Sequence, residues 1–277
     1  MKNRYPFIFV HGMFGWGEKI GIDKISPYWG GTTGSLMKYL RKQGYECYSA
    51  SVGPVASAWD DACELYAQRM GTRVDYGKAH SEAHGHRRFG RPYKKPLCEG
   101  FGKRKLHLIG HSHGGQVIRL LAHLLTYGDE TEKNATDAED ISPLFTGGKA
   151  DYIESITTIC SPHNGSTLYQ VVEDKNLLHT LGRFTDFMMG LLGRTPLHGR
   201  FVDYQFEQFG LTPVKGEFKP DKLFTAMNRI RDGEDYVLSD LSLKGAYELS
   251  VVVLVKADGR LVQNIKYAHQ AGADLRS

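Results

Sequence analysis

Apolar and polar positions along the chain follow two patterns, one typical of buried strands and one typical of helices. Four runs rich in apolar and β-branched residues, each bounded by glycine or polar turns, have the pattern of buried strands: 6–10, 45–52, 106–109 and 153–160. Between them, residues 34–41, 58–70 and 116–125 carry apolar side chains three or four positions apart, as helices do when one face is packed. This alternation predicts an α/β protein with a mostly parallel sheet.

Two later segments have patterns of their own. The acidic and polar stretch 129–140 predicts a solvated loop. Residues 175–192 predict an amphipathic helix with an unusually wide apolar face. Such a helix either packs into the core or forms a mobile lid that meets lipid or substrate, and the pattern alone leaves both interpretations open.

The composition is that of a soluble globular chain. Its 277 residues suit one large domain, and the shares of hydrophobic (41%) and charged (24%) residues are ordinary. The net charge of +4 is too small to indicate a polyanionic partner. One stretch is rich in basic residues, but no nucleic-acid-binding pattern accompanies it, so we expect a solvated face and no nucleic acid. These residues are Arg87, Arg88, Arg91, Lys94, Lys95, Lys103, Arg104 and Lys105.

No apolar run approaches the roughly 20 residues that a membrane-spanning helix needs. The start of the chain, MKNRYPFIFVHG, runs into a glycine turn without a small-residue cleavage site, so we interpret it as a core strand and not as a signal peptide. The four cysteines lie far apart and form no CxxC pair, which predicts buried free thiols. They are Cys47, Cys63, Cys98 and Cys160.

A serine stands between two glycines at the end of the third predicted strand. The sequence Gly110-His111-Ser112-His113-Gly114 has the GxSxG form, with a buried strand before it and a helical pattern after it. A tight strand-to-helix turn of this kind exposes the serine Oγ, provided that small residues flank it. Ser112 is therefore the candidate nucleophile, and a purely structural turn is the alternative.

An ester hydrolase also needs two amide N–H groups that face the developing oxyanion. One comes from the residue after the nucleophile, here His113, and the other from the loop after an earlier strand. The sequence FVHGM follows the first predicted strand, and Gly12 lets the backbone turn there, so Met13 is the candidate second donor. The alternative is that this His-Gly pair only makes a turn.

Three histidines fall within seven residues: His80, His84 and His86. Asp60 and Asp61 lie upstream of them. Zinc takes about four N, O or S ligands in a tetrahedron, and a mixed set of histidine and carboxylate groups suits it. Three clustered histidines more often form a polar loop than a metal site, and the spacing alone leaves both interpretations open.

Several longer strings resemble the secreted bacterial lipases of the staphylococcal and thermophilic Bacillus (Geobacillus) type. They are HGMFGWGE, YWGG, VGPVASAWDDACELYAQ, VDYGKAHSEAHGHRRFGR, GHSHGGQ, SPLFTGG and TTICSPHNGSTL, in order over about residues 5–249. The resemblance implies an α/β-hydrolase fold, hydrolysis of triacylglycerols and other carboxylic esters at an oil-water interface, a helical lid at 170–232 and a structural Zn²⁺ in an insertion at 56–100. It implies secretion, with a cytoplasmic location as the alternative because no signal peptide is found, and it leaves the oligomeric state unknown.

Carried over by position, the resemblance assigns roles to individual residues. It makes Ser112 the nucleophile and the backbone amides of Met13 and His113 the oxyanion donors. It also implies a zinc ligand set in which His84 and Asp61 lie beside the matching positions: Asp60, His80, His86 and, from DGEDYVLSDLS, Asp235.

The resemblance ends near residue 250. A serine nucleophile needs a general base and an orienting carboxylate, which follow it in the order serine, acid, histidine in this fold. Asp258 and His269 come in that order, although the segment between them is short for the helix and strand that normally separate the pair. We therefore expect a lipase chain truncated or altered in reading frame near this point, without the family's late strands and Ca²⁺ site. The run 251–255 is expected to patch the exposed sheet edge. The alternative to an enzyme is a fragment that binds zinc and lipid without turnover.

Overall fold

The computed structural model describes residues 4–100, 104–166, 203, 205, 207–209, 235–249, 255–257 and 260–262. The predicted amphipathic helix at 175–192, nearly all of the predicted lid, and both Asp258 and His269 lie outside these residues. Among the described residues, no helix combines the length and apolarity needed to cross a membrane.

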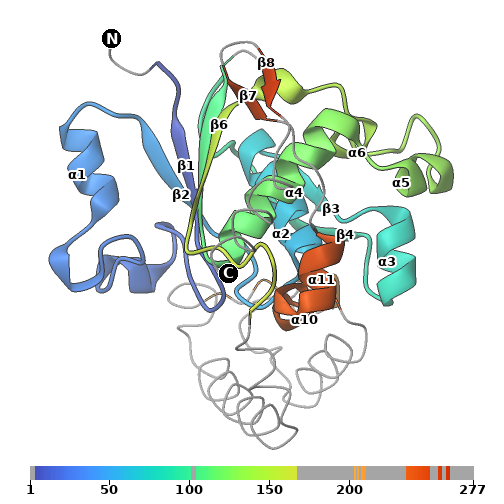
Figure 1. The fold of residues 1–277 in the computed structure, drawn as a ribbon, viewed down its shortest axis with the longest axis horizontal. Coiled ribbons are helices and arrows are strands. Elements are labelled where there is room, and N and C mark those ends of the chain that lie inside the picture. The colour runs from blue at the N-terminus through green and yellow to red at the C-terminus, as the bar shows by residue number, and fades with distance from the viewer. Residues whose placement is uncertain are drawn as a thin grey trace, which may run out of the picture.

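A parallel sheet of four strands forms the centre of the fold (Figure 1). Its strands lie in the order β2-β1-β5-β6, and every neighbouring pair is parallel. All four were predicted from the sequence, with small differences at the ends: β1 (Phe7–Val10), β2 (Cys47–Ala50), β5 (Leu106–His111) and β6 (Ile153–Ile159). Because the strands are parallel and in register, with Val10 opposite Ala50 and Gly110, their carboxyl ends meet at one edge.

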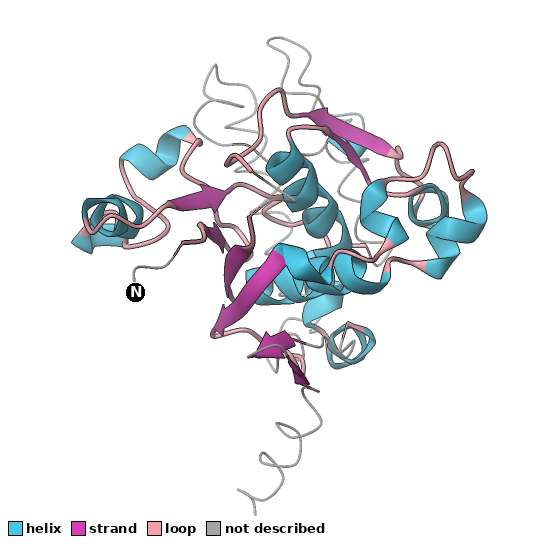
Figure 2. Ribbon diagram, turned by 90° about the horizontal axis from the view of Figure 1, so that it is seen from above, coloured by secondary structure: helices cyan, strands magenta, loops and turns pink. Residues whose placement is uncertain are grey.

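Helices cover both faces of this sheet, as Figures 1 and 2 show. The helices α2 (Ala58–Met70) and α4 (His113–Tyr127) pack on one face, and α1 (Leu36–Lys42) packs on the other. In β1 the side chains alternate as a strand requires: Ile8 and Val10 join the core under α2 and α4, while Phe9 packs with the α1 side.

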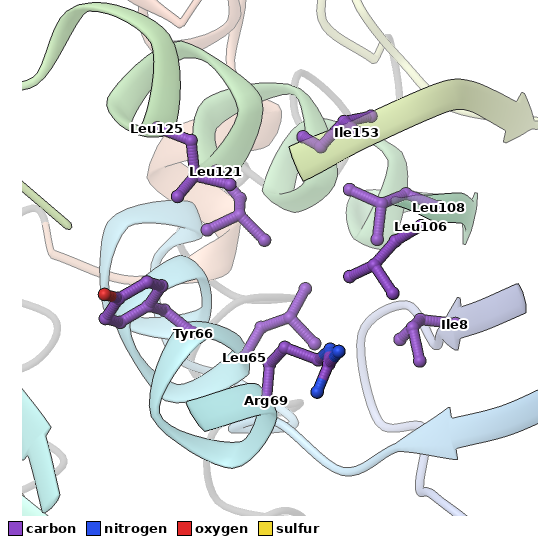
Figure 3. Close-up of a pocket in the computed structure, with 9 residues that line it drawn as sticks. All are labelled: Ile8, Leu65, Tyr66, Arg69, Leu106, Leu108, Leu121, Leu125 and Ile153. Atoms are coloured by element: carbon purple, nitrogen blue, oxygen red, sulfur yellow. The ribbon is translucent and has the colours of Figure 1, made fainter. Parts of the chain in front are cut away.

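The core between the sheet and the pair α2 and α4 contains a small apolar gap (Figure 3). Arg69 is the one charged side chain among the residues that line it, and its guanidinium group donates a hydrogen bond to the Cys98 carbonyl. The other lining residues include Leu106 at the start of β5 and Leu125 near the end of α4. The gap therefore lies toward the amino ends of the strands, away from the edge at which Ser112 is found.

The segment 56–100 adds a small unit beside α2. The strands β3 (Arg73–Asp75) and β4 (Phe89–Pro92) pair antiparallel, and α3 (Lys78–His84) lies between them in sequence. Ser57 caps α2 by accepting a hydrogen bond from the Asp60 amide, and Gly71 ends that helix in the left-handed conformation. Both ends of α2 are thereby fixed, which sets the position of Asp60 in its first turn.

Short elements complete the described chain. The helices are α5 (Glu130–Ala135), α6 (Pro143–Thr146), α10 (Val237–Leu241) and α11 (Leu243–Glu248). Single 3₁₀ turns occur at η1 (Gly21–Lys24), η2 (Gly31–Thr33), η3 (Ala150–Tyr152) and η4 (Glu207–Phe209). The strands β7 (Val255–Ala257) and β8 (Arg260–Val262) pair antiparallel with each other.

Two sequence-based expectations were wrong. Residues 129–140 are not simply a solvated loop, because α5 forms there and buries Glu132. Cys160 is exposed, while the other three cysteines are buried as predicted, because it lies at the end of β6, the edge strand of the sheet. Residues 251–254 of the run expected to patch the sheet edge lie outside the described residues, and the described Val255 pairs with Val262 of β8.

Four of the eight residues of the basic stretch form ion pairs with acidic groups. Arg88 contacts Asp75 and Asp140, and Arg91 contacts Asp203 and Glu207. Arg104 and Lys105 also form ion pairs, with Glu46 and Glu154 respectively. These four cations form ion pairs within the fold.

Candidate active site and metal centre

Ser112 lies on a sharp bend between β5 and α4. Its backbone has φ 55° and ψ −127°, a conformation that L residues rarely adopt. The bend requires the flanking glycines, because a Cβ on Gly110 would lie 2.3 Å from the Gly114 carbonyl oxygen. A Cβ on Gly114 would lie 2.4 Å from the Val10 carbonyl oxygen. The Ser112 amide donates to Ile159 O at 2.9 Å, so the bend is also fixed to β6.

The loop that follows β1 lies directly against Ser112. A Cβ built on Gly12 would come within 2.8 Å of the Ser112 Cβ and 3.3 Å of its Oγ. The Gly12 amide donates to the Tyr28 hydroxyl at 2.9 Å, and the Phe14 amide donates to Pro54 O at 2.8 Å. Among the described residues, no acceptor bonds to the Met13 amide between them. The loop is thus held on both sides of Met13 and leaves that amide available.

His113 opens α4, so its amide belongs to the first turn of a helix. Amides of a first helical turn have no acceptor within the helix and carry the positive end of its dipole. Within the described part of the chain, the His113 amide donates to no protein oxygen. The bend therefore places an unused N–H directly after Ser112, and the Gly12 loop supplies the neighbouring one.

His11 fixes the same loop from inside the protein. Its Nε2 accepts a hydrogen bond from the Val52 amide at 3.2 Å, so Nδ1 carries the proton and donates to Gly12 O at 2.9 Å. Burial lowers the pKa of His11 to about 4, which keeps the ring neutral. His11 is therefore committed to the loop and does not contact Ser112 as a base.

The other histidines near this edge are also committed elsewhere. His111 Nδ1 lies 2.6 Å from the Tyr28 hydroxyl. His163 Nδ1 accepts from Arg119 at 2.7 Å, and burial, together with the Arg119 charge, lowers the pKa of His163 to about 4. His113 faces two carboxylates and not Oγ. Among the described residues, no histidine is hydrogen-bonded to Ser112 Oγ.

A second cluster lies beside α2 and joins four residues that the resemblance grouped as metal ligands. They are Asp60, His80, His86 and Asp235, and one ligand atom from each lies within 4.8 Å of the others. The structure thus brings together Asp60 from α2, His80 from α3, and two residues from loops. His84 and Asp61, the neighbours of the expected ligands, are not part of this cluster.

The distances within the cluster suit a tetrahedral ion. His80 Nε2 lies 3.2 Å from Asp60 Oδ1 and 3.4 Å from Asp235 Oδ2. His86 Nε2 lies 3.8 and 3.3 Å from the same two oxygens. Ligands bound at about 2.0 Å in a tetrahedron are separated by about 3.3 Å.

The same four atoms are buried and make no hydrogen bond within the described residues. Buried polar atoms are nearly always paired, so four that converge without partners indicate a missing common partner. The charges support this interpretation, since burial raises the pKa of Asp60 and the adjacent Asp235 carboxylate raises it further. A bound cation removes that repulsion, and the residues present fit one.

Groups around the cluster orient its members. Gln208 Nε2 donates to the second Asp60 oxygen at 3.0 Å, and His86 Nδ1 lies 3.0 Å from Arg87 O. The Trp59 ring stacks on His80 at 5.0 Å. Such contacts fix the direction in which a ligand atom points.

Sequence reasoning missed two of the supporting residues. Glu132 accepts hydrogen bonds from the amides of Ala79 and His80, at 3.1 and 2.7 Å, and so holds the start of α3. Its segment was predicted to be a loop, and no signal in the sequence distinguishes it from the other acidic residues there. Gln208 lies 148 positions from Asp60, a separation that no local pattern reveals.

Comparison with known proteins shows the family of the chain. A family model described as the C-terminal domain of lipase-like proteins matches residues 3–274. The chain belongs to this lipase-like family. Members with related sequences include the lipase of Staphylococcus hyicus, 47% identical over 167 residues, and Lipase 2 of Staphylococcus aureus, 44% identical over 166 residues. These alignments cover 60% and 59% of this chain but 26% and 24% of the relatives, so the chain matches about a quarter of their length.

Solved structures that include two lipases share the fold. Lipase 1 of Pelosinus fermentans matches with a TM-score of 0.74 and 39% identity, covering 92% of this chain and 66% of the other. The S. hyicus lipase gives 0.72 and 38%, covering 90% and 63%. EstA of Clostridium botulinum gives 0.75 and 37%, covering 95% and 64%. These matches and the helix-flanked parallel sheet confirm the predicted α/β-hydrolase fold.

Proposed function

We propose that this lipase-like chain hydrolyses carboxylic esters, with Ser112 as the nucleophile. The observation that carries the proposal is the strained Ser112 backbone, with φ 55°, against which the Gly12 loop packs. Strain at one residue of an otherwise regular strand-to-helix junction persists where a function requires it. The family relationship supports an ester or lipid substrate.

In the proposed reaction, Ser112 Oγ attacks the ester carbonyl carbon and its proton passes to a general base. The amides of Met13 and His113 would donate to the carbonyl oxygen as it becomes negative. Collapse of the tetrahedral intermediate breaks the bond to the alcohol oxygen, which takes the proton, and leaves an acyl group on Ser112. Water then hydrolyses this acyl-enzyme by the same steps. Asp258 and His269 remain the proposed acid and base and lie outside the described residues.

For the second cluster we propose a structural zinc ion, held by Asp60, His80, His86 and Asp235. Two imidazole nitrogens and two carboxylate oxygens form a closed set, which leaves no position for a substrate. The ion would supply charge neutralisation and a cross-link between α2, α3 and the segment before α10. Neither secretion nor action at an oil-water interface is tested by the geometry, so both stay predictions.

The proposal is tested with p-nitrophenyl butyrate and a metal analysis on the same sample. We expect turnover by the wild-type chain, loss of turnover in Ser112→Ala, and one zinc per chain in both. Loss of zinc in Asp235→Ala, with Ser112 unchanged, would assign the metal to the cluster. Zinc-loaded, folded protein without turnover excludes ester hydrolysis by this chain.

One observation favours a second candidate, a protein that binds zinc and lipid without turnover. Among the described residues, no histidine contacts Ser112 Oγ, and removal of a triad base typically costs several orders of magnitude in rate. This candidate predicts stoichiometric zinc and partition to lipid droplets with no ester cleavage. The assay above separates the two candidates, because both retain zinc and only one releases p-nitrophenol.

A further inference from the structure

We infer that the His113 imidazole is a positioning group. It connects the metal cluster, formed by Asp60, His80, His86 and Asp235, to the backbone amide of His113, which is the proposed oxyanion donor. The inference rests on the proposed function of that amide. It assigns to the imidazole a role separate from the backbone N–H, and it connects two sites that lie on different elements.

His113 is buried, with 2% of its surface exposed, and lies between two carboxylates. Its Nε2 is 3.3 Å from Asp240 Oδ2, and its Nδ1 is 3.8 Å from Asp61 Oδ2. Asp61 lies in α2 and Asp240 lies in α10, so one imidazole at the start of α4 joins three helices. A buried polar ring is costly to leave unpaired, and the hydrogen bond to Asp240 fixes its orientation with Asp61 near the other nitrogen.

Asp240 strengthens the connection because it has further partners. Its Oδ2 accepts a hydrogen bond from the Ala58 amide at 2.6 Å, and its backbone carbonyl accepts from Gln116 Nε2 at 3.1 Å. The Val237 amide at the start of α10 also donates to Val55 O. Figure 1 shows α10 next to the start of α2, as these bonds require. The start of α4 is therefore tied to α10 and α2 by side chains, not by packing alone.

Both carboxylates that face His113 are close in sequence to metal-cluster residues. Asp61 follows Asp60 directly in the first turn of α2, and Asp235 comes just before α10, which contains Asp240. An ion that pulls Asp60 and Asp235 together therefore also fixes the separation of α2 and α10. That separation determines where the imidazole fits, and the imidazole determines where the His113 amide points.

The position of this amide matters only when negative charge develops on the substrate oxygen. An amide donor of this kind contributes to the transition state and not to ground-state binding, so its displacement lowers kcat with little effect on KM. If His113 had a merely structural role, its substitution would lower the stability of the chain without lowering kcat selectively over KM. It would also leave the release of metal unchanged.

The test compares wild-type protein with His113→Met and Asp240→Asn. Met keeps the backbone amide and much of the buried volume but cannot bond to either carboxylate, and Asn keeps the shape of Asp240 without its charge. Leu124→Ala is the control, because it weakens the far end of α4 and leaves the contacts of His113 with Asp61 and Asp240 in place. Each protein is zinc-loaded, checked for folding by circular dichroism, and mixed with a chromophoric chelator to record the rate of zinc release.

We expect zinc release about 10-fold faster in His113→Met and Asp240→Asn, and unchanged in Leu124→Ala. We expect kcat for p-nitrophenyl butyrate to fall about 10-fold in the first two, with KM nearly constant. Removal of zinc should slow phosphonate labelling of the wild type but add little to the effect of His113→Met. The inference would be overturned if zinc release were unchanged in both His113→Met and Asp240→Asn. It would also be overturned if zinc removal slowed phosphonate labelling equally in the wild type and in His113→Met.

The two proposals fail in different ways. Absence of turnover and labelling in the wild type rejects ester hydrolysis, and then the zinc-release rates alone decide whether His113 is connected to the cluster. Should His113→Met not fold, Asp240→Asn gives the same comparison, because Asn at 240 still offers an acceptor to the Ala58 amide.

Discussion

The Tyr28 hydroxyl lies 2.6 Å from His111 Nδ1 and connects the end of β5 to the loop that follows β1. The same hydroxyl oxygen accepts the Gly12 amide proton at 2.9 Å. One side chain thereby fixes both the residue before the nucleophile and the loop that carries Met13. Burial raises the pKa of Tyr28, which keeps the hydroxyl protonated as this bridge requires.

Tyr28→Phe should lower kcat for ester hydrolysis about 10-fold with little change in KM. The substitution removes the acceptor of the Gly12 amide and lets the loop shift relative to Ser112, which affects the developing oxyanion most. Steady-state kinetics on p-nitrophenyl butyrate measure both constants. Tyr39→Phe, at an exposed position in α1, is the matched control and should leave them unchanged. A rise in KM alone would contradict this account of Tyr28.

Gly12→Ala should reduce activity far more than it reduces stability. The new methyl group would lie 2.8 Å from the Ser112 Cβ and 3.3 Å from its Oγ, so either the loop or the nucleophile must move. Gly148→Ala is the contrasting control: its φ of 76° penalises a side chain, but nothing lies within 4 Å of it. Gly12→Ala should therefore lose most of its turnover, whereas Gly148→Ala should lose some stability in urea unfolding and keep its turnover. An equal loss of turnover in the two variants would count against the loop geometry.

Glu132→Gln should weaken both the fold and the affinity for zinc. The carboxylate accepts two amide protons at the start of the helix that carries His80, whereas a glutamine has a single acceptor oxygen. We expect a loss of about 1–3 kcal/mol in the free energy of unfolding, the range for a charged hydrogen bond. Urea unfolding and zinc titration measure the two effects. Glu130→Gln, whose side chain is exposed and pairs with Lys133, should show neither.

His11 should make the chain less stable as the pH falls. Burial lowers its pKa from 6.5 to about 4, so the folded state binds fewer protons than the unfolded state between these values. The contribution is complete above pH 6.5 and is lost as the pH falls to 4, amounting to about 3 kcal/mol at most. Urea unfolding between pH 7 and 5 should give a shallower pH dependence in His11→Gln, and identical slopes would show that His11 is not neutral in the fold.

Local patterns predicted the parts of this fold that depend on neighbouring residues. The strands β1 and β5 follow from short apolar runs, and the bend at Ser112 follows from the glycines on either side of it. The proposed ligands Asp60, His80 and His86 also lie near each other in sequence. Asp235 was assigned through family resemblance alone, because nothing near it in the sequence points to a metal.

The remaining features depend on contacts between distant segments. Glu132 was placed in a solvated loop because an acidic segment normally faces water, whereas two amides at the start of α3 stabilise its burial. The contact between His113 and Asp240 spans 127 positions and has no local signature. The exposure of Cys160 results from the position of β6 at the sheet edge, which a single strand pattern does not specify.

The account depends most on the reactivity of Ser112, which a covalent label measures directly. Zinc-loaded protein is incubated with a p-nitrophenyl phosphonate ester, digested and analysed by mass spectrometry. We predict one adduct per chain, on the peptide that contains Ser112, and none in Ser112→Ala. An unlabelled wild type, or an adduct that persists in Ser112→Ala, would contradict the assignment of the nucleophile.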